Sequence, residues 1–232
     1  KLQGGCVHHD NGILGAACIP RAEERRVETL KASGYNAIRT SHNPPSRDFL
    51  DACDRLGMVV IDEAFDCWEN GNKNPQDYHL YFKDWWQRDL EAMILRDRNH
   101  PSVMFWSIGN EINERAEPKG VEIGKALQAA AHKLDPTRPV TAAICHPWDH
   151  AGKKWEDMQP AFTYLDVAGY NYQWQEYEND HAKYAERVMM GTESFPNEAY
   201  QNWAAVEKNS YVIGDFVWTA VDYLGESGIG HS

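Results

Sequence analysis

The sequence lacks several features that would place a protein in a class at once. Its 232 residues include five cysteines, an odd number without Cys-x-x-Cys spacing, so a framework of disulfides that pairs every cysteine is excluded. No apolar run approaches the roughly 20 residues that a membrane-spanning helix needs. The polar opening at residues 1–5 does not have the layout of a signal peptide. We therefore expect no membrane span, and the cellular compartment stays open.

Positive charge is also scarce. The chain has 23 Lys and Arg against 35 Asp and Glu, a net charge of −12, and no basic cluster that could follow a phosphate backbone, so nucleic acid is not expected as a partner. Hydrophobic residues make up 42% of the chain, enough to bury a sizeable core. Aromatic residues are plentiful, with nine Trp and eleven Tyr. Because sugar rings stack on such faces, this mildly indicates a carbohydrate ligand, although ordinary core packing would explain most of these residues.

Short apolar runs alternate with longer helical patterns along the chain. We expect strands at 4–10, 36–41, 58–65, 103–111, 139–144, 164–172, 188–195 and 210–221. Helices are expected at 21–34, 47–57, 82–100, 121–135, 180–188 and 199–209, with a short helix or a loop at 146–160. This alternation predicts an α/β fold of the (β/α)8 TIM-barrel type, as one domain over residues 1–232. An open doubly wound sheet is the alternative, because periodicity alone does not show closure.

Polar side chains end most of the predicted strands. In such barrels the active site forms where the carboxyl ends of the strands meet, so these side chains are the candidates for function. They are His9, Asp10, Arg39, His42, Asp62, Glu63, Asn110, Glu111, Asn171, Tyr172 and Glu193, with Trp218 inside the last strand. Carboxylates, amides, an arginine and aromatic rings suit an uncharged ligand with many hydroxyl groups.

Two glutamates of this set suit the cleavage of a glycosidic bond. That reaction needs one carboxyl group to protonate the leaving oxygen and another to attack the sugar or to activate water. Glu111 and Glu193 end the fourth and seventh predicted strands, on opposite sides of the barrel mouth, so a substrate bond fits between them. If they face each other at about 5–5.5 Å, the second is a nucleophile and the configuration is retained. Asn110 would then hydrogen-bond the sugar 2-hydroxyl.

Other interpretations of the same residues stay open. Glu63 is equally explained as a loop carboxylate that pairs with a nearby Arg. His8, His9, His42 and Glu63 would form the metal centre of a barrel hydrolase acting on amides or esters. Strand geometry argues against that centre, because His8 and His9 point to opposite faces if the first strand extends so far. A domain that only binds carbohydrate would keep the aromatic and amide residues and make the glutamates incidental.

Three segments resemble the catalytic barrel of glycoside hydrolase family 2. Residues 5–10 (GCVHHD) resemble the opening G-V-x-R-H-x-D of the family, residues 36–65 match its N-x-I-R-T-S-H-x-P to D-E stretch, and residues 100–111 match its acid/base strand. The resemblance implies a retaining, exo-acting hydrolase in which Glu111 is the general acid/base and Glu193 the nucleophile. It also implies that Asn110 contacts the 2-hydroxyl, Tyr172 lies close to the nucleophile and Trp218 contacts the sugar. His9, Asp10, Arg39 and His42 correspond to residues that line the pocket.

The chain departs from the family pattern in two ways. His8 stands where the family has Arg, and no β-sandwich domain precedes the barrel. Together with the missing initiator Met, this leads us to expect a catalytic domain excised from a longer multidomain enzyme. No cofactor is expected to be required, although some members bind magnesium and sodium beside the site, and Glu63 would serve such an ion. A homo-oligomer is compatible with the sequence.

The resemblance also implies a substrate class. Residues 192–196 (TESFP) and 222–226 (DYLGE) look most like those of bacterial β-galactosidases, so β-galactosides are the first expectation. β-Glucuronides are the second, and mannosides and glucosides are further options. A glucuronidase needs a cation for the sugar carboxylate, and the net charge of −12 mildly disfavours anionic substrates.

Overall fold

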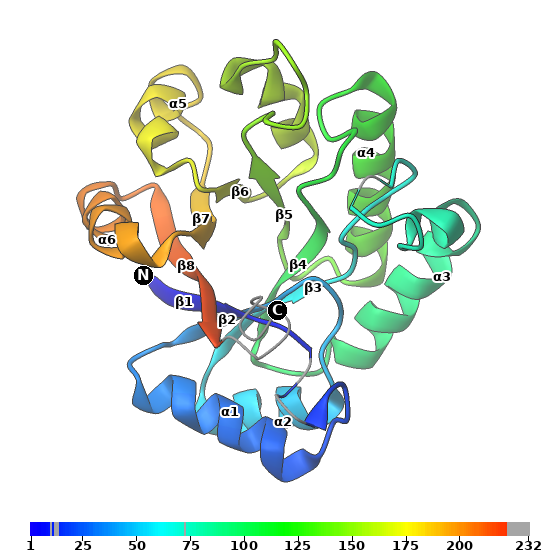
Figure 1. Cartoon of the computed structure of the whole chain (residues 1–232), viewed down its shortest axis with the longest axis vertical. Helices are drawn as coiled ribbons and strands as arrows, with labels where there is room; N and C mark the ends of the chain where they lie inside the picture. Colours follow the sequence, from blue (N-terminus) through cyan, green and yellow to red (C-terminus); the bar gives the residue numbers. More distant parts are fainter. Residues whose placement is uncertain (10, 12–13, 72, 222–232) are drawn as a thin grey trace, which may run out of the picture.

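The computed structural model describes residues 1–9, 11, 14–71 and 73–221 of the chain. Eight parallel strands pair in sequence order, and the last pairs with the first, so the sheet is a closed barrel (Figure 1). The strands are β1 (Leu2–Val7), β2 (Ala37–Thr40), β3 (Val59–Glu63), β4 (Val103–Asn110), β5 (Val140–Cys145), β6 (Ala168–Asn171), β7 (Met189–Ser194) and β8 (Val212–Val221). The predicted TIM barrel is confirmed, because closure excludes the open doubly wound sheet.

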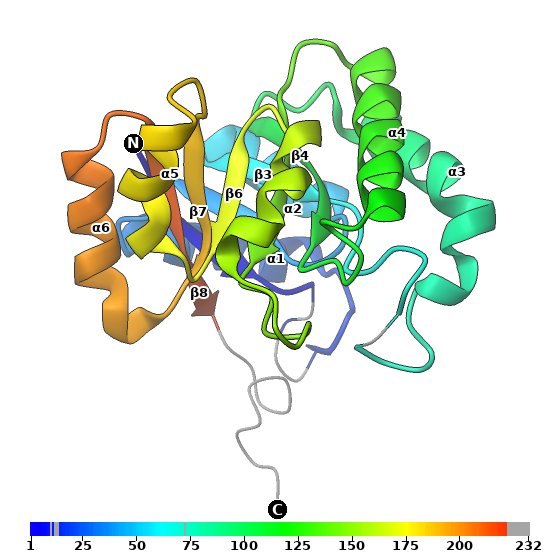
Figure 2. The same cartoon turned by 90° about the horizontal axis from the view of Figure 1, so that it is seen from above.

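Helices follow the strands and cover the outside of the barrel (Figures 1 and 2). The α-helices are α1 (Pro20–Ala32), α2 (Arg47–Leu56), α3 (His79–Asp97), α4 (Pro118–Leu134), α5 (Tyr177–Lys183) and α6 (Ala199–Lys208), and the 3-10 helices are η2 (Trp155–Tyr164), η3 (Trp174–Glu176) and η4 (Pro196–Glu198). The 3-10 helix η2 follows β5, where the sequence predicted a short helix or a loop in place of a full α-helix. Each helix in these described ranges is too short or too polar to cross a bilayer.

Local sequence explains where α2 begins and ends. The Ser46 side chain accepts a hydrogen bond from the Phe49 N–H at 3.1 Å and so caps the first turn. Gly57 ends the helix in the left-handed region, at φ 69°, which glycine adopts without steric cost. Phe49, Leu50 and Cys53 lie on the buried face of α2.

Several predicted boundaries were wrong: the end of the first strand, the start of the sixth strand, which is Ala168 instead of residue 164, and both ends of the fifth α-helix. The first strand ends at Val7 instead of residue 10, because its partner β2 ends at Thr40 and the chain then enters the loop with Pro44 and Pro45, which have no N–H to continue the pairing. His8 and His9 therefore lie beyond the strand. The helix predicted at 180–188 begins at Tyr177, which is buried and packs edge-on against Tyr170 of β6, and it ends at Lys183.

The barrel interior changes from apolar to polar along the strands. An apolar cluster fills the lower layers and consists of Cys6, Ala37, Ile61, Phe105, Val167, Met190 and Phe216. Because side chains alternate between faces of a strand, Arg39 and Glu63 lie one layer above Ala37 and Ile61 on the inward face. The larger core cluster lies between the strands and the helices. The interior thus carries its polar groups at the carboxyl ends of the strands.

A carboxyl group on β8 adds a pH dependence to stability. Asp215 is 5% exposed and accepts from the Ser194 hydroxyl at 2.7 Å, while its Oδ1 has no hydrogen-bond partner among the described residues. Burial raises the pKa of Asp215 from 3.8 to about 6. The folded state therefore holds this proton more tightly than the unfolded state. The resulting stability is present below pH 3.8 and is lost as the pH rises through about 6.

We expect Asp215→Asn to remove this loss. Between pH 4 and pH 8 the free energy of unfolding of the variant, relative to the natural protein, should rise by about 2–3 kcal/mol. Urea unfolding at several pH values measures the difference, with Asp84→Asn on the exposed face of α3 as the control. A pH-independent difference would show that Asp215 does not titrate in this range.

Candidate active site

A buried arginine ties together the carboxyl ends of four strands. Arg39 on β2 has no exposed surface. Its guanidinium donates to both oxygens of Glu63 on β3, at 2.8 and 2.9 Å, and to Glu193 Oε1 on β7, at 2.8 Å. It also donates to Asn110 Oδ1 on β4, at 2.9 Å. Burial opposes its charge, but Glu63 and Glu193 hold the pKa of Arg39 well above its ordinary value, so Arg39 is a permanent cation within the site.

Glu63 is fully engaged by its neighbours. Its Oε1 also accepts from His42 Nδ1 at 2.8 Å, and its Oε2 accepts from the Ser107 hydroxyl at 2.7 Å. Burial alone would raise the pKa of Glu63, but Arg39 and His42 bring it to about 2. The interpretation of Glu63 as a carboxylate that pairs with an Arg is confirmed. A magnesium or sodium ion on Glu63 does not fit these contacts, and an ion elsewhere beside the site stays a prediction.

Glu111 lies in the turn that directly follows β4. Its backbone has φ 45°, a left-handed conformation that is costly for a non-glycine residue and often marks functional sites, and its N–H donates to the Ala143 carbonyl on β5 at 2.9 Å. Its Oε1 accepts from Asn171 Nδ2 on β6 at 3.0 Å. Burial, and then the negative charge of Glu193, raise the pKa of Glu111. A raised pKa favours the protonated form that a general acid needs.

Glu193 differs from Glu111 in its surroundings. It is 4% exposed and pairs with the guanidinium of Arg39. Tyr172 follows β6 with φ 58°, and its N–H donates to the Glu193 carbonyl at 2.8 Å. Burial, the charge of Glu193 and a hydrogen bond to its carboxylate raise the pKa of Tyr172, and the charge of Glu111 adds to the rise. The Tyr172 hydroxyl therefore lies close to both carboxylates and keeps its proton at neutral pH.

Trp218 on β8 forms an aromatic wall with two histidines. The His42 ring lies parallel to the indole, at an angle of 8° and with ring centres 5.0 Å apart. The His8 ring meets the indole edge-on, also with centres 5.0 Å apart. His8, which replaces the arginine of the family pattern, thus adds a second imidazole ring to this wall. The predicted residues His42 and Trp218 are in direct contact.

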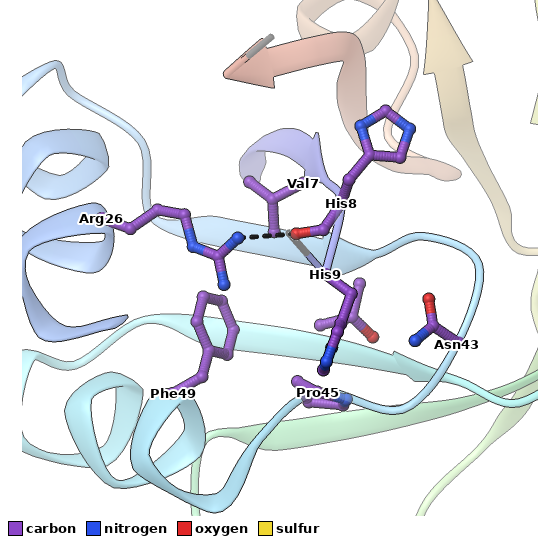
Figure 3. A pocket seen from close by; sticks show the side chains of 8 residues that line it. Val7, His8, His9, Arg26, Asn43, Pro45 and Phe49 are labelled. Carbon is purple, nitrogen blue, oxygen red and sulfur yellow. Dashed lines mark hydrogen bonds between the residues drawn. The ribbon is translucent and has the colours of Figure 1, made fainter. Parts of the chain in front are cut away.

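His9 lies in the loop that follows β1. It lines a cleft of about 340 Å³ together with His8, His42 and Asp66, and its Nε2 is 3.5 Å from Cys18 Sγ. Figure 3 shows the rings of His8 and His9 pointing in different directions, on either side of the chain, while Arg26 donates to the His8 carbonyl at 2.6 Å. The predicted residue Asp10 lies outside the described residues.

The residues considered for a metal centre do not meet at one point. His8 packs on Trp218, His9 contacts Cys18, and the oxygens of Glu63 are occupied. The described residues therefore do not support this alternative, and for a reason other than strand alternation, because His8 and His9 lie beyond β1. Within the described ranges, the group of three side chains with ligand atoms within 4.8 Å of one another is Asp51, Asp54 and His100, at the amino-terminal side of β4.

Sequence reasoning missed two residues of the loop between β3 and α3. Asp66 Oδ1 accepts from Asn110 Nδ2 at 3.0 Å and pairs with Lys73. Lys73 Nζ also donates to the Asn110 carbonyl at 2.9 Å, and its charge acts to lower the pKa of Glu111. The loop has no periodic pattern, so the one available signal was its position after a barrel strand. Asn171 was among the strand-end candidates, but no role in the site was predicted for it.

The fold and the site together have the layout of a TIM-barrel active site. Two carboxyl groups in unlike surroundings, a buried arginine, two amides and an aromatic wall gather at the carboxyl ends of parallel strands, where TIM-barrel enzymes have their active sites. Comparison with known proteins identifies the family. Residues 2–223 match the family described as glycosyl hydrolases family 2, TIM barrel domain, and the chain belongs to this family.

Relatives from several bacteria share the whole barrel. The chain is 35% identical to β-galactosidase BoGH2A of Bacteroides ovatus, over 97% of this chain and 34% of that protein. It is 31% identical to a putative β-glucuronidase of Formosa agariphila, over 100% of this chain and 26% of that protein. A crystal structure of a glycosyl hydrolase family 2 member from Bacteroides cellulosilyticus matches with a TM-score of 0.92 and 50% identity, over 99% of this chain and 29% of that protein. The chain thus spans about a third or less of the length of these relatives.

Proposed function

We propose that the protein is a retaining, exo-acting hydrolase of terminal β-D-glycosides, and that the barrel is the catalytic domain of a longer enzyme. The observation that carries the proposal is the unlike environment of the two glutamates. Burial and the charge of Glu193 raise the pKa of Glu111, whereas Glu193 is paired with the cationic Arg39. One carboxyl group is therefore suited to donate a proton and the other to attack as an anion.

The proposed reaction is a double displacement. Glu111 protonates the leaving oxygen while Glu193 attacks the anomeric carbon and forms a glycosyl-enzyme bond. Glu111, now a carboxylate, takes a proton from water, which attacks the same carbon and releases Glu193. Asn110, whose Oδ1 accepts from Arg39 and Asn171, would contact the 2-hydroxyl, and Tyr172 would donate to Glu193. His9, His42 and Trp218 would contact the rest of the sugar.

β-Galactosides are the proposed substrates. Two observations support this choice: the relative from Bacteroides ovatus carries the name β-galactosidase, and two cations whose charges act on Glu111, Lys73 and Arg39, are already paired with carboxylates. β-Glucuronides are the alternative, because the relative from Formosa agariphila carries the name putative β-glucuronidase. The segment at 222–226 on which part of the expectation rests lies outside the described residues.

A screen of nitrophenyl β-D-glycosides on the intact natural protein tests the proposal. We expect release of nitrophenol from the galactoside and retention of the β configuration in the first sugar product, which proton NMR detects. Activity abolished by EDTA but kept in Glu193→Gln would refute the mechanism and favour a metal-dependent hydrolase. Binding of the glycosides without any cleavage would instead favour a carbohydrate-binding domain.

Lys73 offers a further test through pH dependence. Its positive charge opposes the rise in the pKa of Glu111, so Lys73→Met should raise that pKa further. The alkaline limb of kcat/KM, where the acid form of Glu111 is lost, should therefore move to higher pH. Lys73→Arg keeps the charge and should leave the limb in place, as should Lys119→Met on exposed α4. A limb that moves equally in the Met and Arg variants would exclude this role of the charge.

A further inference from the structure

An exposed aromatic ring lies two residues beyond the proposed nucleophile. Phe195 directly follows β7 and is 48% exposed. Its ring stacks on the ring of Tyr172, with ring centres 4.2 Å apart and an angle of 27°. A single exposed apolar side chain is common on protein surfaces. The partner of this ring, rather than its exposure, is therefore the feature that requires an explanation.

Tyr172 needs support from outside its own segment. Its left-handed backbone, at φ 58°, costs a non-glycine residue about 1–3 kcal/mol. Its N–H donates to the Glu193 carbonyl at 2.8 Å, and its carbonyl accepts from the Gln173 side chain at 2.8 Å. These two bonds hold the backbone, but neither of them restricts rotation of the side chain. A ring stacked on the phenol does restrict it.

The Phe195 ring is presented by a segment that is itself held in place. Pro196 opens the 3-10 helix η4, and the Glu198 N–H donates to the Phe195 carbonyl at 2.9 Å. The Glu198 carboxylate accepts from the indole N–H of Trp174 in η3 at 3.0 Å. The loops that follow β6 and β7 are thus joined by this bond as well as by the stacked rings.

The position of the Tyr172 hydroxyl matters because it lies close to both glutamates. After burial, the charge of Glu193, a hydrogen bond to its carboxylate and the charge of Glu111 all contribute to the raised pKa of Tyr172. The hydroxyl is at the far end of the ring, so a small rotation of the side chain displaces it more than any other atom of the residue. A displacement of about 1 Å in an active site can lower a rate about a hundredfold.

We propose that Phe195 is a positioning residue, whose ring holds the Tyr172 hydroxyl against the carboxylate of Glu193. Phe195 acts through Tyr172 and not on the reacting atoms. This inference rests on the proposed glycosidase function and adds to it a residue that sets the rate from outside the barrel strands.

A double-mutant cycle tests the proposal in the intact natural protein. With the nitrophenyl glycoside that is cleaved fastest, Phe195→Ala should lower kcat/KM by about tenfold or more, whereas Phe195→Tyr keeps a stacked ring and should stay within about threefold of the natural value. Added to Tyr172→Phe, Phe195→Ala should cost less than about threefold, because the hydroxyl that the ring positions is absent. Tyr200→Ala, which removes a ring that is 83% exposed on α6, is the control and should keep full activity.

Ultraviolet titration of the tyrosines provides a second measurement that does not depend on turnover. If the phenol moves away from the two carboxylates in Phe195→Ala, the pKa of Tyr172 should fall toward its ordinary value of 10. At about pH 11 the variant should then show about one more ionised tyrosine than the natural protein. Adding Tyr172→Phe should remove this difference.

Several outcomes would overturn the role of Phe195. One is an unchanged kcat/KM in Phe195→Ala, and another is an undiminished loss in the Tyr172→Phe background, which would mean that the ring contacts the substrate or supports the fold. If Phe195→Ala does not fold, Phe195→Leu keeps the apolar volume without a flat ring and takes its place in both measurements. If the natural protein cleaves no β-glycoside, the proposed function fails, and the titration still decides whether Phe195 holds the phenol.

Discussion

Replacing Glu193 by alanine is expected to lower kcat/KM by about 10⁴-fold or more for every β-glycoside that the natural protein cleaves. The carboxylate supplies the bond that forms as the leaving group departs, and no other carboxylate among the described residues pairs with both Arg39 and Tyr172. Removing it also leaves the Arg39 guanidinium with an unpaired N–H in a buried site. Initial rates with nitrophenyl glycosides measure the effect.

Two controls separate loss of the nucleophile from loss of the fold. Glu122→Gln, on the exposed surface of α4, should keep full activity. Azide is small enough to occupy the space of the missing carboxylate, so it should restore some activity to Glu193→Ala and yield an α-glycosyl azide. A β-glycosyl azide, or full activity of Glu193→Ala without azide, would show that Glu193 is not the nucleophile.

The second large effect is expected at Glu111 and depends on the leaving group. Without this general acid, kcat/KM for substrates with poor leaving groups, such as disaccharides, should fall by about 10²–10⁴-fold in Glu111→Ala. Dinitrophenyl glycosides need no proton to depart, so their kcat/KM should fall much less. The alkaline limb of the pH profile, which reports the raised pKa of Glu111, should disappear in the same variant. Measuring kcat/KM for a series of aryl glycosides over a range of pH tests both expectations.

An equal fall in kcat/KM for all substrates would contradict this role of Glu111. If kcat/KM falls equally for substrates with good and with poor leaving groups in Glu111→Ala, the residue positions the substrate and does not transfer the proton. Azide again serves as a check, because it would attack the glycosyl-enzyme from the side where Glu111 normally activates water. The product expected here is the β-glycosyl azide, of configuration opposite to that expected from Glu193→Ala.

The barrel could be predicted because its signals are local. Apolar strands and amphipathic helices alternate along the chain, and α2 even carries its capping Ser46 and terminal Gly57 in sequence. The boundaries that failed depend on partners distant in the chain. β1 stops at Val7 because β2 stops at Thr40, and α5 begins at Tyr177, which is buried against Tyr170 of β6. Neither cause is visible in the segment itself.

The residues of the site likewise fall into those that could be predicted from local sequence and those that could not. Residues that end strands, such as Arg39, Asn110 and Glu193, could be predicted, because strand direction alone brings them to one end of the barrel. Lys73 and its contact with the Asn110 carbonyl could not, since the contact joins a nonperiodic loop to a strand end 37 residues away. The roles assigned to Glu111 and Glu193 stay predictions, although their surroundings differ in the expected direction.

The shared guanidinium of Arg39 has a consequence for redesign. One side chain serves Glu63, Glu193 and Asn110 at once, through fixed planar geometry and with no exposed surface. Lysine, with a single nitrogen, cannot reproduce these directions, so no graded series of substitutions exists at this position. We therefore expect specificity to vary through single substitutions at the edge of the cleft, for example at His8 and His9, and Arg39 itself to tolerate no substitution.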